Sequence, residues 1–173
     1  APLIHEDGNI MSKSTLVNGD VKTAIANAKY VVTRKYKTPH QEHAFMEPEC
    51  AVALPEGEDG LLVYTGGQSV YDEQREIAGM LKIPREKVRC HSMLVGGGFG
   101  GKEDMSVQHH AALMAWYTKK PVKVKFTRQE SLAYHTKRHP MEIEITTACD
   151  ENGILTGMKA VIIADTGAYA SLG

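Results

Sequence analysis

The stretch Val95-Gly96-Gly97-Gly98-Phe99-Gly100-Gly101-Lys102-Glu103 is the densest motif of the chain, because five of the sixteen glycines lie within six positions. It lies between an apolar run at 88–95, which predicts a buried strand, and a helical pattern at 105–118. Glycine lacks a Cβ atom and adopts positive φ readily, so the backbone of such a loop can approach a ligand closely. The N–H groups of the loop and the dipole of the following helix both favour an anion. The motif therefore predicts a binding loop.

Two nucleotide-binding interpretations of this loop each fail at one position. Counted from Gly96, the glycines satisfy the dinucleotide pattern G-x-G-x-x-G, but the stretch 117–127 holds no acidic residue for the ribose. The same glycines with Lys102 satisfy most of the phosphate-binding P-loop, but Glu103 stands where a hydroxyl should hold Mg²⁺. A glycine-rich turn without a ligand is the third interpretation. It is disfavoured because ordering so many flexible positions is costly.

The rest of the chain alternates strand and helix patterns. We predict strands at 30–36, 50–54, 61–65, 88–95, 122–126, 141–145 and 154–164. We predict helices after Asp20, at 70–81 and at 105–118. Turn residues between the strands, such as Asn152-Gly153, indicate hairpins. The predicted fold class is α+β, with mixed, largely antiparallel sheets packed with a few helices.

The composition excludes several classes of function. The chain has 173 residues, 42% of them apolar and 24% charged, and its formal net charge is −1. These values are typical of an ordered globular protein. No apolar run approaches the roughly 18 residues of a membrane-spanning helix, and the charge balance does not favour nucleic acid or a membrane surface as a partner. We therefore expect a soluble, cytoplasmic protein that binds neither nucleic acid nor membranes.

The cysteines and histidines form no complete metal-site pattern. The three cysteines are far apart without C-x-x-C spacing, which argues against a disulfide scaffold and an iron–sulfur cluster on this chain. His40-x-x-His43 and His135-x-x-x-His139 have ligand-like spacings, but no carboxylate or cysteine spacing completes a zinc site. We interpret the histidines as structural.

The glycine loop resembles the molybdopterin loop of the molybdenum hydroxylases, the xanthine dehydrogenase and aldehyde oxidase family. Gln41-Glu42-His43-Ala44-Phe45-Met46-Glu47-Pro48 resembles the segment that opens the molybdenum-binding domain of this family. Leu62-Val63-Tyr64-Thr65-Gly66-Gly67-Gln68-Ser69 resembles the strand and turn that bear its cofactor glutamine, and Arg138-His139-Pro140 matches a family tripeptide. The resemblance implies that residues 38–173 are the N-terminal part of the molybdopterin-binding domain. Residues 1–37 resemble the end of the smaller domain that precedes it, with Thr38-Pro39 at the boundary.

The resemblance also implies roles for individual residues. Gln68 would hydrogen-bond an oxygen ligand of the molybdenum and so serve both the cofactor and the reaction. Backbone N–H groups of the loop would contact the pterin cofactor and the metal ligands, namely those of Gly97, Gly98, Phe99, Gly100 and Gly101. These roles predict that Gln68 and Phe99 lie at one site, and a separation of Gln68 from the loop beyond about 15 Å, larger than a cofactor's ligand shell, would contradict it.

The prediction of the substrate class depends on Glu103. In the purine-oxidising branch of the family a glutamate follows the loop lysine, whereas aldehyde oxidases more often have an apolar residue there. The resemblance therefore implies that Glu103 lies at the start of the following helix and contacts a purine or related N-heterocycle. An ion pair between Glu103 and Lys102 is the structural alternative.

These inferences predict a fragment of a molybdenum-dependent hydroxylase closest to the bacterial xanthine dehydrogenase-like enzymes. It would oxidise xanthine, hypoxanthine or related N-heterocycles with oxygen derived from water, using a molybdopterin-type molybdenum cofactor. FAD and 2Fe-2S clusters are expected on other domains or subunits, which with the remainder of its own subunit would be its partners in an oligomeric parent. The family's catalytic glutamate and substrate-clamping arginine lie beyond residue 173, so we expect the chain alone to be inactive. The alternatives are a nucleotide-binding module without redox chemistry, an aldehyde oxidase-type substrate and a non-catalytic assembly domain.

Overall fold

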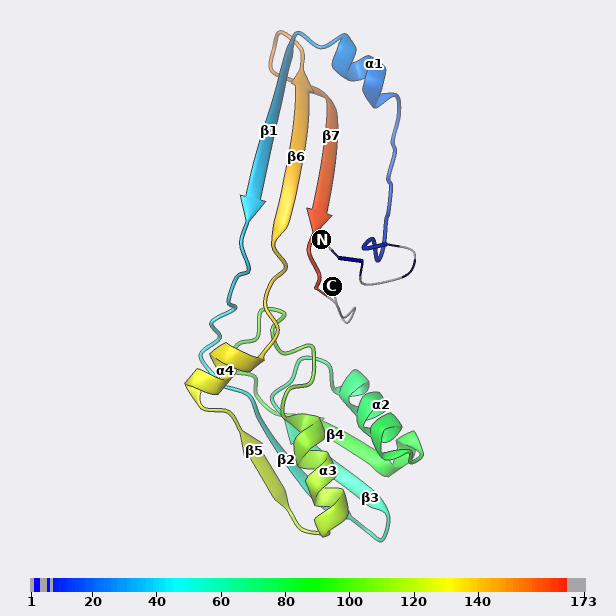
Figure 1. The fold of residues 1–173 in the computed structure, drawn as a ribbon, viewed down its shortest axis with the longest axis vertical. Helices are drawn as coiled ribbons and strands as arrows, with labels where there is room; N and C mark the ends of the chain where they lie inside the picture. The colour runs from blue at the N-terminus through cyan, green and yellow to red at the C-terminus, as the bar shows by residue number, and fades with distance from the viewer. Residues whose placement is uncertain (1, 4–5, 7, 168–173) are drawn as a thin grey trace. The chain divides into compact units, whose positions relative to one another are not determined.

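The computed structural model describes residues 2–3, 6 and 8–167, and these residues form two compact units (Figure 1). Of the described residues, the first unit contains those up to Gln41 and those from His139 to Gly167, and the second contains Glu42–Arg138. The assignment of 1–37 and 38–173 to two domains of a parent protein stays a prediction. In chain order the elements are α1 (Val21–Ala26), β1 (Tyr30–Thr38), β2 (Cys50–Glu56), β3 (Gly60–Thr65), α2 (Val70–Leu81), the 3₁₀ turn η1 (Arg85–Lys87), β4 (Val88–Ser92), α3 (Gln108–Thr118), β5 (Val122–Lys125), α4 (Arg128–Tyr134), β6 (Met141–Cys149) and β7 (Leu155–Ala164).

The second unit is a four-stranded sheet in the order β4-β3-β2-β5, with α2 and α3 packed on it. β2 pairs antiparallel with both β3 and β5, and β3 pairs parallel with β4 through the α2 crossover. Alternate residues of β2 and β3 are fully buried because side chains of a strand point to opposite faces. The core they form with the helices contains Ala51, Ala53, Leu61, Val63, Ile77, Ala78, Val88, Val107, Ala111, Ala112 and Ala115. The many alanines let α3 lie close to the sheet.

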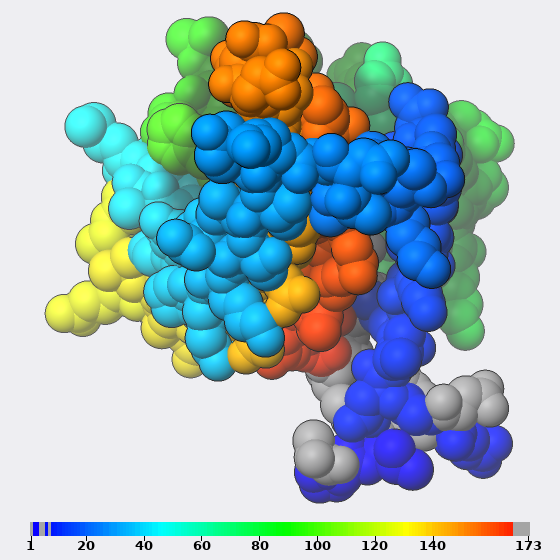
Figure 2. All heavy atoms as spheres, turned by 90° about the horizontal axis from the view of Figure 1, so that it is seen from above, coloured from blue at the N-terminus to red at the C-terminus, as the bar shows by residue number. Residues whose placement is uncertain are grey.

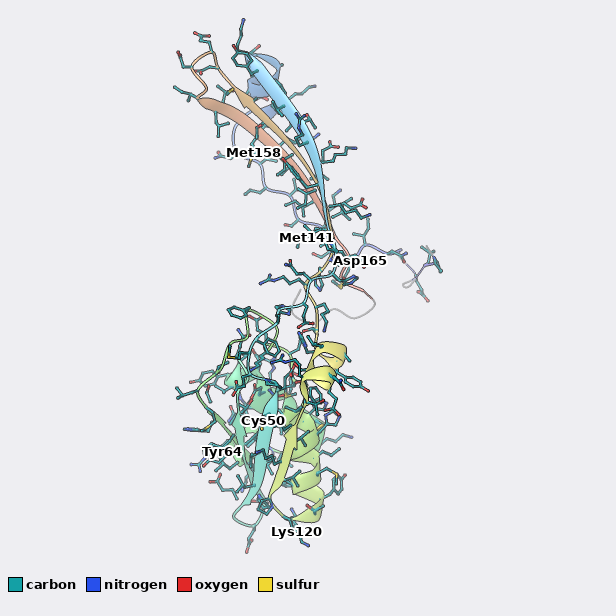
Figure 3. All side chains as sticks on the ribbon, turned by 90° about the vertical axis from the view of Figure 1, so that its left-hand side faces the viewer. Cys50, Tyr64, Lys120, Met141, Met158 and Asp165 are labelled. Carbon is teal, nitrogen blue, oxygen red and sulfur yellow. The ribbon has the colours of Figure 1, made fainter. Side chains whose placement is uncertain are left out.

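The first unit is a three-stranded antiparallel sheet in the order β1-β6-β7, with α1 against β7. Asp20 begins α1 by accepting a hydrogen bond from the Thr23 N–H (3.0 Å). In the space-filling view, α1 and the turn between β6 and β7 lie at the same end of this sheet (Figure 2). All nine residues of β1 are exposed, and side chains including Met158 extend from the strands (Figure 3).

The predicted α+β class is confirmed, as are the hairpin of β2 and β3 and the helix over 70–81. The structure differs from the sequence-based expectation at several places, and the strand predicted over 141–145 continues to Cys149. The strand predicted over 88–95 ends at Ser92, and the helix predicted from 105 begins at Gln108, so the loop between them is longer than the sequence pattern indicates. Helix α4 was not predicted, although Thr127 and Glu130 form its capping box. No helix of the described residues has the length and apolar character needed to cross a membrane.

The substitution Ile77→Ala tests the core of the second unit. Ile77 is fully buried between α2 and the sheet. We expect its truncation to lower the free energy of unfolding by about 2–5 kcal/mol, because it removes apolar contact and leaves a cavity. Urea unfolding followed by circular dichroism measures the change. Met80→Ala is the control, because Met80 lies on the same helix with 39% of its surface exposed. Equal effects of the two substitutions would contradict this core assignment.

Candidate functional site

The glycine loop connects β4 to α3 and bends sharply at its centre. Gly97, Phe99 and Gly100 have φ values of 95°, 55° and 90°. Phe99 is thus a non-glycine residue in the left-handed region, and 65% of its surface is exposed. A hydrogen bond from the Gly101 N–H to the Gly98 carbonyl (2.8 Å) closes the turn. Phe99 and Gly100 are exposed, whereas Gly98 is buried.

Gln68 holds this loop from the neighbouring turn. β3 ends at Thr65, and its parallel pairing with β4 places the two following segments at the same edge of the sheet. Gln68 Oε1 accepts hydrogen bonds from the N–H groups of Gly100 and Lys102 (3.1 Å each), and the Gln68 N–H donates to the Lys102 carbonyl (2.8 Å). The predicted proximity of Gln68 to the loop is therefore confirmed. Since Oε1 is used inside the loop, the amide NH₂ group of Gln68 is left as a donor.

The contact between Gln68 and the loop requires a glycine at position 98. A Cβ atom on residue 98 would lie 2.2 Å from Gln68 Oε1, far inside van der Waals contact. The missing side chain of Gly98 therefore leaves the space in which the Gln68 carboxamide lies against the loop.

Glu47 holds the start of the loop. Its Oε2 atom accepts hydrogen bonds from the Gly96 N–H (2.8 Å) and from Lys102 Nζ (2.9 Å), and its own N–H donates to the Gly96 carbonyl (3.1 Å). Lys102 is buried, and its ammonium lies 4.7 Å from the ring centre of Phe45. Burial raises the pKa of Glu47, but the hydrogen bonds from Gly96 and Lys102 outweigh it, so the pKa lies below its ordinary value. The carboxylate form is therefore favoured.

Glu103 differs from the sequence-based expectation in two respects. It lies in the loop ahead of α3, which begins at Gln108, rather than at the start of the helix. Lys102 pairs with Glu47, so the alternative of an ion pair between Lys102 and Glu103 is wrong. Glu103 is exposed, and among the described residues it has no hydrogen-bond or ion-pair partner.

Arg138, the first residue of the tripeptide Arg138-His139-Pro140, contacts the tip of the loop. Its Nη2 atom donates to the carbonyl oxygen of Phe99 (3.0 Å). The tripeptide that contains Arg138 could be identified from the sequence. Its contact with Phe99 could not, because no spacing rule relates positions 99 and 138.

A partly buried cluster of ionisable side chains lies beside the loop. The ligand atoms of Glu42, His43 and His135 all lie within 4.8 Å of one another, and His135 Nε2 is 2.9 Å from Glu42 Oε1. Lys137 Nζ is 3.0 Å from the other carboxylate oxygen of Glu42, so an ammonium already balances this charge. Burial and the neighbouring positive charges lower the pKa of His43. We interpret the cluster as a support of the loop, because a Cβ atom on Gly101 would lie 2.8 Å from His43 Nδ1.

The sequence did not predict this cluster. Glu42 is adjacent to His43 in the chain, whereas His135 follows α4, and only the fold brings them together. The adjacency of Glu42 to His43 was the available signal.

The hydrogen bonds of the loop divide its N–H groups into two sets. Within the described residues, four N–H groups have protein acceptors: those of Gly96, Gly100, Gly101 and Lys102. The three consecutive N–H groups between them have none: those of Gly97, Gly98 and Phe99. Free backbone donors are rare unless solvent or a ligand satisfies them. A row of such donors on a fixed backbone fits a ligand with acceptor oxygens or sulfurs or with negative charge.

The sequence of the chain is similar to those of known proteins. A sequence model described as the molybdopterin cofactor-binding domain matches residues 4–173. The chain is 43% identical over its full length to a probable xanthine dehydrogenase subunit of Bacillus subtilis, of which it covers 23%. It is 42% identical to the nicotinate dehydrogenase large molybdopterin subunit of Eubacterium barkeri, of which it covers 41%. The chain thus spans less than half the length of these relatives.

Solved structures agree with this match. The quinoline 2-oxidoreductase of Pseudomonas putida 86 is similar over 95% of the chain and 21% of its own, with 25% identity and a TM-score of 0.81. The aldehyde oxidoreductase of Desulfovibrio gigas shares the fold over 84% of the chain and 16% of its own, with 23% identity and a TM-score of 0.77.

The substitution Gly98→Ala tests the contact between Gln68 and the loop. We expect it to displace the Gln68 carboxamide, because the new methyl group would occupy the position of Oε1. Amide hydrogen exchange of the Gly100 and Lys102 N–H groups should then accelerate, by at least about tenfold where one hydrogen bond is lost. Gly79→Ala on α2 is the control, since a Cβ atom there meets nothing within 4 Å. Unchanged exchange in Gly98→Ala would contradict the described contact.

Proposed function

The chain belongs to the molybdopterin cofactor-binding domain family, and from this premise we propose that it forms the cofactor-holding part of an N-heterocycle hydroxylase. The observation that carries the proposal is the row of free N–H groups at Gly97, Gly98 and Phe99. The residues fit a molybdopterin group, because the backbone donors are fixed by contacts on both sides and no side chain intervenes at the two glycines. Gln68 adds its amide NH₂ beside them.

The cofactor would supply the two-electron oxidation that places a water-derived oxygen on an electron-poor carbon. The chain's own residues bind and orient it. The free N–H groups would hold its anionic and acceptor atoms, and Gln68 would donate a hydrogen bond to an oxygen ligand of the molybdenum. Glu47, Lys102 and Arg138 keep the loop in shape without contacting the cofactor in this proposal. Such donors contribute most when their positions are fixed before the ligand arrives.

The proposed substrate is a purine, such as xanthine or hypoxanthine, or a related N-heterocycle. The support is Glu103, whose exposed carboxylate has no partner among the described residues and is therefore available to hydrogen-bond a ring N–H. The names of three similar proteins refer to xanthine, nicotinate and quinoline, all of them N-heterocycles. An aldehyde gives a glutamate less to recognise, because it lacks a ring donor.

A nucleotide-binding module is not favoured. Glu103 lies at the end of the loop where a nucleotide phosphate would need a hydroxyl or a cation, and β5 pairs antiparallel in the sheet, unlike a dinucleotide-binding fold.

Further parts of the parent protein complete this proposal. The strands of the first unit expose large apolar side chains, namely Tyr30, Val31, Val32, Tyr36, Leu155, Met158, Val161, Ile162 and Ile163. Exposed apolar surface of this kind marks an interaction site. We propose that the remainder of the subunit covers it in an oligomeric, cytoplasmic enzyme, with FAD and 2Fe-2S centres on other domains or subunits. The catalytic base and the substrate clamp would also lie on the remainder of the subunit, so the chain alone would be inactive.

The substitution Gln68→Glu in the parent enzyme tests the cofactor role. A glutamate keeps an oxygen that can accept from Gly100 and Lys102 but replaces the amide donor. We expect kcat to fall by about 10²-fold or more, the typical cost of one preorganised donor, while the melting temperature changes little. Metal analysis of the same preparations measures molybdenum per subunit. A parent enzyme without molybdenum, or micromolar binding of ATP or NAD to the wild-type protein by calorimetry, would overturn the proposed function.

The substitution Glu103→Leu tests the substrate class. Losing a hydrogen bond to a charged group costs about 1.5–3 kcal/mol, which corresponds to a drop of about 10- to 100-fold in kcat/KM for xanthine or hypoxanthine, whose rings carry N–H donors. An aromatic aldehyde should lose much less, because it lacks the ring N–H. Steady-state assays with an artificial electron acceptor measure both ratios, and Glu58→Leu, an exposed acidic residue in the turn between β2 and β3, is the control. An equal loss for aldehyde and heterocycle would count against Glu103 as a substrate contact.

A further inference from the structure

A buried carboxyl group lies directly behind the turn that carries Gln68. Glu73 belongs to the first turn of α2, and only 1% of its surface is exposed. Its Oε1 atom accepts hydrogen bonds from Gln108 Nε2 (3.0 Å) and from the Thr65 hydroxyl (3.3 Å). Its Oε2 atom is buried without a hydrogen-bond partner among the described residues. A buried carboxyl group is costly unless its contacts compensate for lost hydration, so the position requires an explanation.

The carboxyl group is packed against the backbone of the turn itself. A Cβ atom on Gly67 would lie 1.7 Å from Glu73 Oε1, so the carboxyl occupies the space where a side chain of residue 67 would be. The hydroxyl of Thr65 accepts from the Gly67 N–H (2.9 Å) and donates to Glu73. Gln68 is the next residue, so its backbone position depends on this packing.

Gln108 connects the same carboxyl group to the backbone just before α3. The side-chain oxygen of Gln108 accepts from the N–H groups of Ser106 and Val107 (3.1 Å each), just before α3 begins. Its amide nitrogen donates to Glu73 and to the Thr65 hydroxyl (3.2 Å). The Glu73 carboxyl group therefore contacts the end of β3 and the Gly67–Gln68 turn directly, and it is connected through Gln108 to the residues just before α3.

We propose that Glu73 is a positioning residue, whose buried carboxyl group fixes the Gly67–Gln68 turn against the start of α3 and so aims the Gln68 amide at the cofactor site. The positioning of the turn stands on the contacts above, whereas its consequence for turnover rests on the proposed function. Burial raises the pKa of Glu73, and the hydrogen bonds from Gln108 and Thr65 offset this only in part. Relative to a carboxyl group in water, burial therefore stabilises the protonated form of Glu73.

Substitutions in the parent holoenzyme test the proposal. Glu73→Gln keeps a side-chain oxygen in the same shape and should retain kcat within about threefold. Glu73→Leu keeps the volume but removes the acceptor for Thr65 and Gln108. Because Thr65 and Gln108 each lose their hydrogen bond to Glu73 and the Gln68 turn loses its support, we expect kcat to fall by about tenfold or more with KM nearly unchanged. Glu76→Gln is the matched control, since this acid on the same helix has a 53% exposed side chain.

Hydrogen exchange of the Gly67 and Gln68 N–H groups is the readout that does not depend on turnover. We expect it to accelerate in Glu73→Leu and to stay near the wild-type rate in Glu73→Gln and Glu76→Gln. If Glu73→Leu does not fold, Thr65→Val supplies the test, because it removes the hydroxyl between Gly67 and Glu73 while keeping the shape. Wild-type exchange at Gly67 and Gln68 in whichever of these variants folds would overturn the proposal.

The two proposals fail in different ways. A parent enzyme without molybdenum would remove the proposed function but leave the exchange result at Gly67 as the measure of Glu73. Faster exchange with normal molybdenum content and unchanged kcat would show that Glu73 orders the turn without affecting the reaction, and would overturn the positioning role. A changed Mo(V) resonance spectrum in Glu73→Leu, with normal metal content, would support it.

Stability as a function of pH gives an independent measurement. A carboxyl group whose pKa is higher in the folded state than its ordinary value of 4.5 binds more protons when folded. The free energy of unfolding therefore falls as pH rises from about 4.5 through the raised value. The Cys90 thiol, whose pKa burial and the Glu73 charge raise to about 12, does not titrate in this range. Glu73→Gln should remove this part of the pH dependence, and an identical profile in the two proteins would contradict the assigned burial of the acid.

Discussion

The two hydrogen bonds that Gln68 Oε1 accepts from Gly100 and Lys102 are the interaction on which the site depends. A loop made mainly of glycine has few side chains of its own and a high conformational entropy, so its shape must be imposed from outside. Gln68 imposes it at the end of the loop, Glu47 at the start and Arg138 at the tip. Each of the three comes from a different segment of the chain.

The glycines of the site matter more because they lack a side chain than because their backbone is flexible. At Gly98 the missing side chain is replaced by the carboxamide of Gln68, and at Gly67 it is replaced by the carboxyl group of Glu73. In both places a polar group from another segment fills the position of a Cβ atom, and its hydrogen bonds hold the backbone nearby. Packing of this kind orders the loop, while Phe99 and Gly100 stay exposed.

The sequence predicted the elements well and the contacts between them poorly. Strand and helix periods located α2 without error, because its apolar spacing and the nearby Pro84 are local signals. The family resemblance located Gln68 and the loop, although their roles stay predictions until the proposed substitutions are measured. Sequence reasoning missed Glu73 because a glutamate in the first turn of a helix is an ordinary solvent-facing choice. Its burial follows from the parallel pairing of β3 with β4, which brings α2 behind the turn.

The division of the loop's N–H groups explains why the loop is ordered in this way. Four of them are bound by the protein, and this fixes the direction of the three free ones between them. Donors fixed in advance lose little entropy when a ligand binds, so more of their hydrogen-bond energy contributes to affinity. Gln68 itself is exposed, so its position depends on the buried Thr65 and Glu73 behind its turn, and a mobile Gln68 would leave the loop without this support. Burial of a carboxyl group behind Gly67 is costly in isolation, and its place in the structure is explained by the donors that it helps to hold in position.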